Sequence, residues 1–241
     1  MENIDASLSR DLLQLVNKSR DIGASSWLNA LPLEEQGLSM NKQEFRDILR
    51  LLYNLPLLCL PSHCACGDKF TVGHALSCKK GGFVAQKHDG IRDLLTTLTC
   101  KVRKNGEAEP HLQPLDNERF DQRNAVTSSE ARLGIKAGGL WSFFDVRVTH
   151  VNSKCSQNKP TSTIFKEHEN EKKRKCQQRI LDVEMGTFTP LVFGTNGGMG
   201  VECQMFLKHL VDKLSRKDGE PYVVVITWLR TRLSFEILRS V

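Results

Sequence analysis

The sequence lacks any run approaching the roughly 18 consecutive apolar residues that a membrane-spanning helix needs. Its beginning, MENIDASLSRDLL, carries acidic residues and no uninterrupted apolar segment of the kind found in secretory signals. It also contains no internal repeat and no YxDD-like polymerase motif. We therefore expect an intracellular chain that does not insert into a membrane and carries no polymerase active site.

Acidic residues are in the minority, because 28 Asp and Glu oppose 34 Lys and Arg and leave a formal net charge of +6. Such an excess favours a polyanionic partner, although many basic proteins bind no nucleic acid. With 241 residues the chain can bury a sizeable core, as one domain or as a small module beside a larger one. Composition alone names no reaction.

Apolar residues recur at helical spacing in several segments, and shorter apolar runs between turn residues have the length of strands. Asn41 is the expected cap of one helix, and Glu171 and Lys175 form a supporting i,i+4 pair in another. A polar stretch without a period, residues 115–130, is predicted to be a loop. The mixture predicts an α/β fold with a helical segment over residues 1–57. Helices are predicted over residues 4–16, 42–53, 83–102, 165–184 and 199–214, and strands over residues 131–136, 143–151 and 188–193.

Cysteine and histidine are concentrated in one short segment with the spacing C-x-C-x7-H-x3-C, formed by Cys64, Cys66, His74 and Cys78. Three thiolates and one imidazole satisfy tetrahedral zinc and leave no open position for catalysis. His74 and Cys78 are one helical turn apart, and Gly67 permits a tight turn after the first pair. The pattern predicts a structural zinc site.

Two observations leave alternatives open at this site. Only one residue separates Cys64 from Cys66, fewer than structural zinc sites usually have, and His63 could substitute or compete as a ligand. The thiols could instead be buried without a metal. Because there is no export signal and ligand types cluster, we predict a zinc knuckle over residues 58–80 in a reducing compartment, followed by a larger domain over residues 81–241.

Six motifs occur in one order along the chain: CACGDKFTVGHALSCKKGGF, HDGIRD, AEPHLQPL, FFDVRV, NEKKRKC and FTPLVFGTNGGMG. In this order they resemble the C-terminal part of retroelement reverse transcriptase polyproteins of animal genomes, over residues 24–241. That region is similar to the restriction-like endonuclease of early-branching non-LTR retrotransposons. The resemblance implies a detached nuclear tail without its polymerase.

The resemblance also implies a fold and partners. A zinc knuckle would precede a mixed sheet flanked by helices, of the PD-(D/E)xK restriction-endonuclease type. Such a domain nicks target DNA so that the polymerase can prime on it. The implied partners are DNA and, in addition, retroelement RNA, with no membrane involved.

The chemistry implied by the resemblance is phosphodiester hydrolysis, in which carboxylates hold Mg²⁺ or Mn²⁺ and a nearby Lys assists water. Asp145, in FFDVRV, matches a metal-binding Asp of the family. The family's Lys comes from the following helix, which indicates Lys172 or Lys175. Arg147 stands where the generic motif has Lys, but a guanidinium stays protonated and is a poor base.

The sequence departs from the family at Gly134, which stands where the family has an upstream acid, and the interval to Asp145 is shorter than usual. Glu130 would face the same side of a strand by its period of two, and Glu109 matches a family acid in AEPHLQPL, so either could stand in. The missing acid at position 134 and the short interval to Asp145 both indicate a weakened or inactive site. Three functions therefore remain open: a DNA endonuclease, a catalytically inactive nucleic-acid-binding module, and a protein-interaction remnant.

Simpler interpretations exist for the same residues. A buried strand that contains one Asp is common, and the cations of residues 172–175 form a solvated helix face by default. In the family context these cations would lie beside a phosphate backbone. The Gly-rich segment of residues 194–200 does not match a phosphate-binding loop and is predicted to be a turn.

Overall fold

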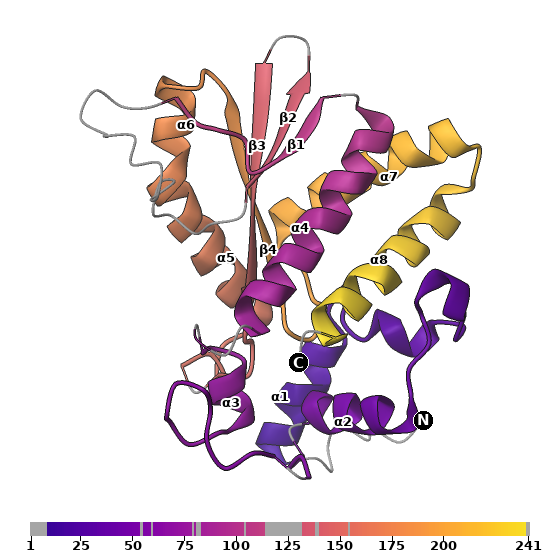
Figure 1. Ribbon diagram of the computed structural model, residues 1–241, viewed down its shortest axis with the longest axis vertical. Coiled ribbons are helices and arrows are strands. Elements are labelled where there is room, and N and C mark those ends of the chain that lie inside the picture. Colours follow the sequence, from indigo (N-terminus) through magenta and orange to yellow (C-terminus); the bar gives the residue numbers. More distant parts are fainter. Residues whose placement is uncertain are drawn as a thin grey trace.

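The computed structural model describes residues 9–53, 55–58, 60–78, 80, 83–103, 105–113, 132–137, 140–153 and 155–239. These residues form a mixed α/β fold, so the predicted class is confirmed (Figure 1). Two short 3-10 helices, Ser26–Asn29 and Glu34–Gln36, lie between the first two α-helices. The α-helices are α1 (Arg10–Ser19), α2 (Lys42–Leu52), α3 (Val72–Ala75), α4 (Phe83–Val102), α5 (Thr161–Lys172), α6 (Gln178–Asp182), α7 (Val201–Asp218) and α8 (Tyr222–Arg239).

The described strands form one four-stranded sheet in sequence order: β1 (Gly106–Ala108), β2 (Arg132–Ala137), β3 (Leu140–Thr149) and β4 (Thr187–Gly194). The pairs β1 with β2 and β2 with β3 are antiparallel, whereas β3 and β4 are parallel and are joined through α5 and α6. A parallel strand covered on both faces needs an almost continuous apolar run, and TFTPLVFG supplies it. The three-residue strand β1 was not predicted.

Helices cover both faces of the sheet (Figure 1). Val146 and Leu191 belong to the largest apolar core, which α4, α7 and α8 share. On the opposite face, Phe143 and Phe188 contact Ile180 of α6. Because successive strand residues face opposite sides, the position of Phe143 places residue 145 on the α5 and α6 side.

The predicted helix of residues 165–184 is interrupted in the structure. It begins earlier, at Thr161, and a π-helical turn, Lys173–Gln177, separates α5 from α6. A π-turn changes the helical phase of the side chains that follow it. Lys172 lies on the buried face of the helix, whereas Lys175, within the π-turn, is exposed.

The N-terminal segment packs against the C-terminal helix. Asn41 caps α2 as predicted and forms a capping box with Glu44. The helix predicted over residues 4–16 is observed from Arg10, and residues 4–8 lie outside the described residues. Trp27 shares a buried cluster with Phe235 of α8, so burial of apolar surface holds this segment in place.

The Gly-rich segment after β4 is a turn, as its sequence predicts. A Cβ atom on Gly197, which has a φ of +89°, would lie 2.9 Å from the carbonyl oxygen of Gly23, so glycine permits this close approach. At the start of α7, the Glu169 carboxylate accepts a hydrogen bond from the backbone N–H of Glu202 at 3.1 Å. A buried carboxylate thus occupies the helix terminus where a phosphate could otherwise bind.

Candidate functional site

The Cys/His segment folds as a tight turn followed by one helical turn. Gly67 has a φ of +95°, and its N–H donates to the carbonyl oxygen of Cys64 at 2.9 Å. The Thr71 hydroxyl caps α3 by accepting from the N–H of His74 at 3.0 Å. The N–H of Cys78 donates to the carbonyl oxygen of His74 at 2.7 Å. Both local features predicted from the spacing, the glycine turn and the helical placement, are confirmed.

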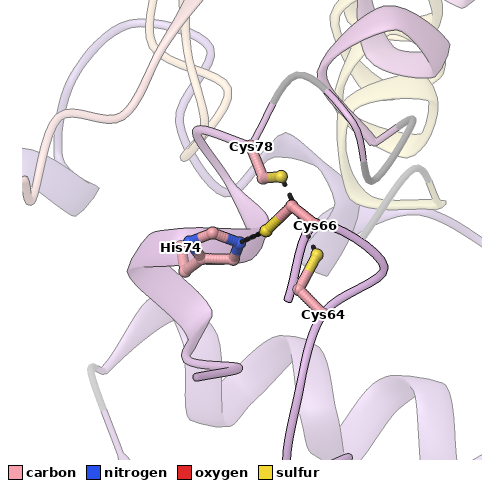
Figure 2. Close-up of side chains that lie close together, drawn as sticks. All are labelled: Cys64, Cys66, His74 and Cys78. Atoms are coloured by element: carbon pink, nitrogen blue, oxygen red, sulfur yellow. Dashed lines mark hydrogen bonds between the residues drawn. The ribbon is translucent and has the colours of Figure 1, made fainter. Parts of the chain in front are cut away.

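The four side chains of this segment, Cys64, Cys66, His74 and Cys78, point toward one another (Figure 2), and their ligand atoms all lie within 4.8 Å of one another. The Sγ atoms of Cys64 and Cys78 are 3.8 Å apart, and Cys66 Sγ is 3.1 Å from His74 Nε2. Thiolates bound to one tetrahedral zinc ion at about 2.3 Å lie about 3.8 Å apart. The cluster could therefore hold a metal ion such as zinc.

His63 does not belong to this cluster. Its side chain is exposed, and its Nδ1 lies 3.1 Å from the Ser62 hydroxyl. Cys66 and His74 are partly exposed, so packing of buried thiols alone does not account for their convergence. The four-residue ligand set predicted from the spacing is the one that the structure brings together.

A second charged centre lies where the sheet meets α5. The Asp145 side chain is 0% exposed, and its Oδ2 is 3.0 Å from Nζ of Lys172, whose side chain is 6% exposed. Two charges can be removed from water at tolerable cost when they are paired in this way. The structure thus brings the predicted metal-binding Asp and one of the two predicted lysines into direct contact.

The other predicted lysine, Lys175, is exposed and pairs with Oε1 of Glu171 at 2.8 Å, as the i,i+4 spacing predicted. Arg147 lies 2.8 Å from the second oxygen of the same carboxylate. The hydrogen bond from Lys175, with the charge of Arg147, lowers the pKa of Glu171 to about 2. Lys175 therefore belongs to a surface network around Glu171.

Glu109 and Glu130 were suggested in place of the family acid that is missing at Gly134, and only Glu109 lies among the described residues. Glu109, just after β1, has a φ of 52°, and its carboxylate accepts a hydrogen bond from Arg92 of α4. Arg92 also contacts Asp89 at 3.0 Å and Asp93 at 2.8 Å, so Glu109 joins a partly exposed ion-pair network. Glu130 lies outside the described residues, and its role stays a prediction.

Gly134 lies on the same face of the sheet as Asp145. It pairs with Phe143 of β3, while Arg132 is directly opposite Asp145, so Gly134 is the diagonal neighbour. Glu107 of β1, which the sequence did not single out, pairs with Gly134 and has an exposed side chain.

The described residues do not assemble a magnesium site here. Mg²⁺ prefers several oxygen ligands in octahedral geometry, whereas Gly134 offers no side-chain oxygen. In the described part of the chain, the Cys/His cluster is the one group of three or more ligand-type side chains within reach of a single ion. Asp145 has instead the Lys172 ammonium beside it.

Sequence reasoning missed His88, which lies in the HDGIRD motif on α4. Its Nε2 is 2.6 Å from the carbonyl oxygen of Val146, just beyond the last residue that β3 pairs with β2. Burial, together with the charge of Lys172, lowers the pKa of His88 and favours the neutral imidazole. Its signal in the sequence was the motif itself, which gave no indication of the residue's contact with the strand.

Lys87, the neighbour of His88, is a buried cation. Its side chain is 2% exposed, and its Nζ has no hydrogen-bond partner among the described residues. Burial lowers the pKa of Lys87 to about 8. Burial, with the charges of Lys87 and Lys18, likewise lowers the pKa of His150 to about 4. The folded chain therefore opposes protonation of both groups.

Replacing Lys87 with Met is expected to stabilise the protein at pH 7 by about 3 kcal/mol, because the charged ammonium no longer has to be buried. From pH 8 to 10.5 the unfolded chain holds more protons than the folded chain at this group, so native stability rises with pH. The advantage of Lys87→Met should shrink across this interval. Urea unfolding at several pH values measures it, with exposed Lys208→Met as the control, and equal behaviour of both variants would contradict the assignment.

No protein-family model and no curated protein matches the chain. Within the described ranges, no helix has both the length and the apolar character needed to cross a membrane.

Proposed function

We propose that this chain is an endonuclease-derived domain of a non-LTR retrotransposon that binds DNA without cleaving it. The contact between Asp145 and Lys172 carries the proposal, because it joins the metal-binding Asp that the resemblance implies to one of the two lysines that the resemblance indicates for hydrolysis. Gly134, on the same sheet face, replaces the acid that hydrolysis also requires. The proposal places the chain in the nucleus, with a restriction-endonuclease-like domain after the knuckle.

Loss of cleavage follows from the charges around Asp145. Hydrolysis by this class of site needs carboxylates that hold a divalent cation against the phosphate. Here the Lys172 ammonium already lies 3.0 Å from the carboxylate and neutralises it inside the protein. A divalent cation would have to displace a buried ion pair and would find no ligand from Gly134.

Binding is supported by the overall charge and by the knuckle. The net charge of +6 favours a polyanion, and phosphate contacts by Lys and Arg dominate affinity for DNA. Cys64, Cys66, His74 and Cys78 would hold zinc, which fixes the loop when bound and supplies no open coordination position. Retroelement RNA is a second polyanion whose binding the same net positive charge would favour.

A second candidate is an active metal-dependent endonuclease. The observation that favours it is again the proximity of Asp145 and Lys172, since a carboxylate beside an amine is what such hydrolysis uses. In that case Glu109 or Glu130 would supply the second acid, and Lys172 or Lys175 would assist the attacking water.

One gel experiment tests the proposal. Supercoiled plasmid is incubated with the protein and Mg²⁺ or Mn²⁺, and each sample is run both directly and after removal of protein. We expect retarded plasmid in the first lane and intact supercoiled plasmid in the second, for the native chain and for Asp145→Ala alike. Nicking that Asp145→Ala abolishes would support the second candidate. Plasmid that is neither retarded nor nicked would leave the protein-interaction remnant.

A further inference from the structure

The positive charge that was expected to face DNA, on residues 172–175, is mostly neutralised within the chain. Each of its three lysines has a carboxylate partner on its own helix or on a neighbouring element. A cation that is already paired gains less from a phosphate, because it must first give up its partner. This helix is therefore a poor principal contact for a polyanion. The pairs are Lys172 with Asp145, Lys173 with Glu202, and Lys175 with Glu171.

A different surface of the molecule carries positive charge with little compensation. A cavity of about 390 Å³ lies between the C-terminal ends of α4 and α7. Four of its six lining residues are cations, and Asp212 is the one acid among them. Asp212 lies 3.0 Å from Arg216, so it offsets one of the four positive charges. The lining residues are Val102, Arg103, Asp212, Lys213, Arg216 and Lys217.

The other cations of this basic cavity remain available. Arg103 and Lys213 are exposed, and no carboxylate of the described residues lies within ion-pair distance of either. Lys217 donates a hydrogen bond to the backbone carbonyl of Lys101 at the end of α4. Among the described residues, the Lys217 ammonium has no acidic partner. Three uncompensated cations thus surround a hollow that is open to solvent.

Capping of helix ends explains only part of this arrangement. Cations near a helix C-terminus interact favourably with the last carbonyls and with the helix dipole, as Lys217 does at the end of α4. Lys213 lies more than a turn before the end of α7 and makes no such contact among the described residues. Arg103 follows the last residue of α4 with its side chain exposed.

We propose that the basic cavity binds backbone phosphates of duplex DNA, an inference that rests on the proposed DNA-binding function and names the surface responsible. Arg103 offers a planar guanidinium group that can bind phosphate oxygens in a bidentate manner, and Lys213 offers a mobile point charge. Arg216 lies beside them and contributes less, because Asp212 already offsets its charge. Contacts of this kind position the protein on DNA and carry no sequence information. The cavity is distinct from the buried pair of Asp145 and Lys172, so binding here does not require cleavage there.

The test compares two triple variants that lose the same charge. One is Arg103→Gln/Lys213→Gln/Arg216→Gln in the basic cavity, which leaves Lys217 to cap α4. The control is Lys42→Gln/Lys166→Gln/Lys208→Gln, three exposed lysines outside the cavity. Affinity for a labelled duplex is measured by fluorescence anisotropy over a series of salt concentrations, and thermal unfolding of each protein is recorded.

We expect the cavity variant to bind about tenfold or more weakly at roughly 0.1 M salt, and its salt slope to fall by about 2 to 3. The control should keep its slope within about 1 of the native value, and both variants should unfold near the native temperature. Equal weakening of both variants, or native affinity in the cavity variant, would overturn the inference alone. If the native chain binds no duplex at any salt concentration, the proposed function falls with it. Should the triple variant fail to fold, the single substitution Lys213→Glu, at an exposed position of α7, repeats the comparison against the equally exposed Lys208→Glu.

Discussion

Replacing Lys172 with Met is expected to destabilise the protein by about 3 to 5 kcal/mol, because it removes the ammonium group that lies beside the buried Asp145 carboxylate. Asp145 is fully buried and Lys172 is 6% exposed, so water cannot replace the lost partner without opening the sheet toward α5. The measurement is urea unfolding of the native and variant proteins at pH 7. Most of the loss of stability should come from the buried Asp145 charge and little from lost packing, since Met has nearly the length of Lys.

Two further variants separate charge from packing. Asp145→Val/Lys172→Met removes both charges and should recover much of the lost stability, because a buried ion pair can often be exchanged for apolar side chains at little cost. Lys175→Met is the matched control, since Lys175 is exposed and its pair with Glu171 is a surface one. It should cost no more than about 1 kcal/mol. If Lys172→Met and Lys175→Met lowered the free energy of unfolding equally, the buried pair would contribute no more to stability than the surface pair.

Removing metal from the Cys/His cluster is expected to unfold residues 60–78. This segment has almost no core of its own, because its buried residues are Cys64, Ala75 and Cys78, two of which are ligands. The free energy of zinc binding at structural sites of small modules is about 10 to 16 kcal/mol, and this binding free energy drives their folding. Metal analysis of the purified protein should find about one equivalent of zinc, and a chelator should remove both the metal and the protection of these amides from hydrogen exchange.

Substitution of a single ligand gives the complementary result. Cys78→Ser should lose the zinc equivalent, whereas Cys100→Ser, which alters an exposed thiol outside the cluster, should retain it. The α/β core should stay folded in both variants, because the buried clusters of the sheet and its helices do not include the Cys/His segment. Purified native protein without zinc, or Cys78→Ser with a full equivalent, would contradict the metal assignment.

Features that depend on local sequence were predictable. The bounds of α4 agree with the periodicity at both ends, and Asn41 identified the start of α2. The Cys/His cluster was predictable for the same reason, since Gly67 and one turn of helix bring the ligands together within a short segment. No long-range contact has to be known for these predictions.

Features that depend on how distant elements meet were not predictable in the same way. The choice between Lys172 and Lys175 depends on which face of α5 meets β3, and the π-turn after Lys172 changes that phase. The spacing also gives no sign that His88 would contact Val146. The basic cavity joins Arg103 to residues of α7 more than a hundred positions later, so only the fold reveals it.

The most direct test of the central claim is the fraction of supercoiled plasmid that the native chain converts to open circles in the presence of Mg²⁺ or Mn²⁺. The account predicts no conversion above the protein-free control, although the plasmid is bound, because Lys172 neutralises Asp145 and Gly134 supplies no second acid. Conversion that disappears in Asp145→Ala would contradict it and would make the chain an active endonuclease.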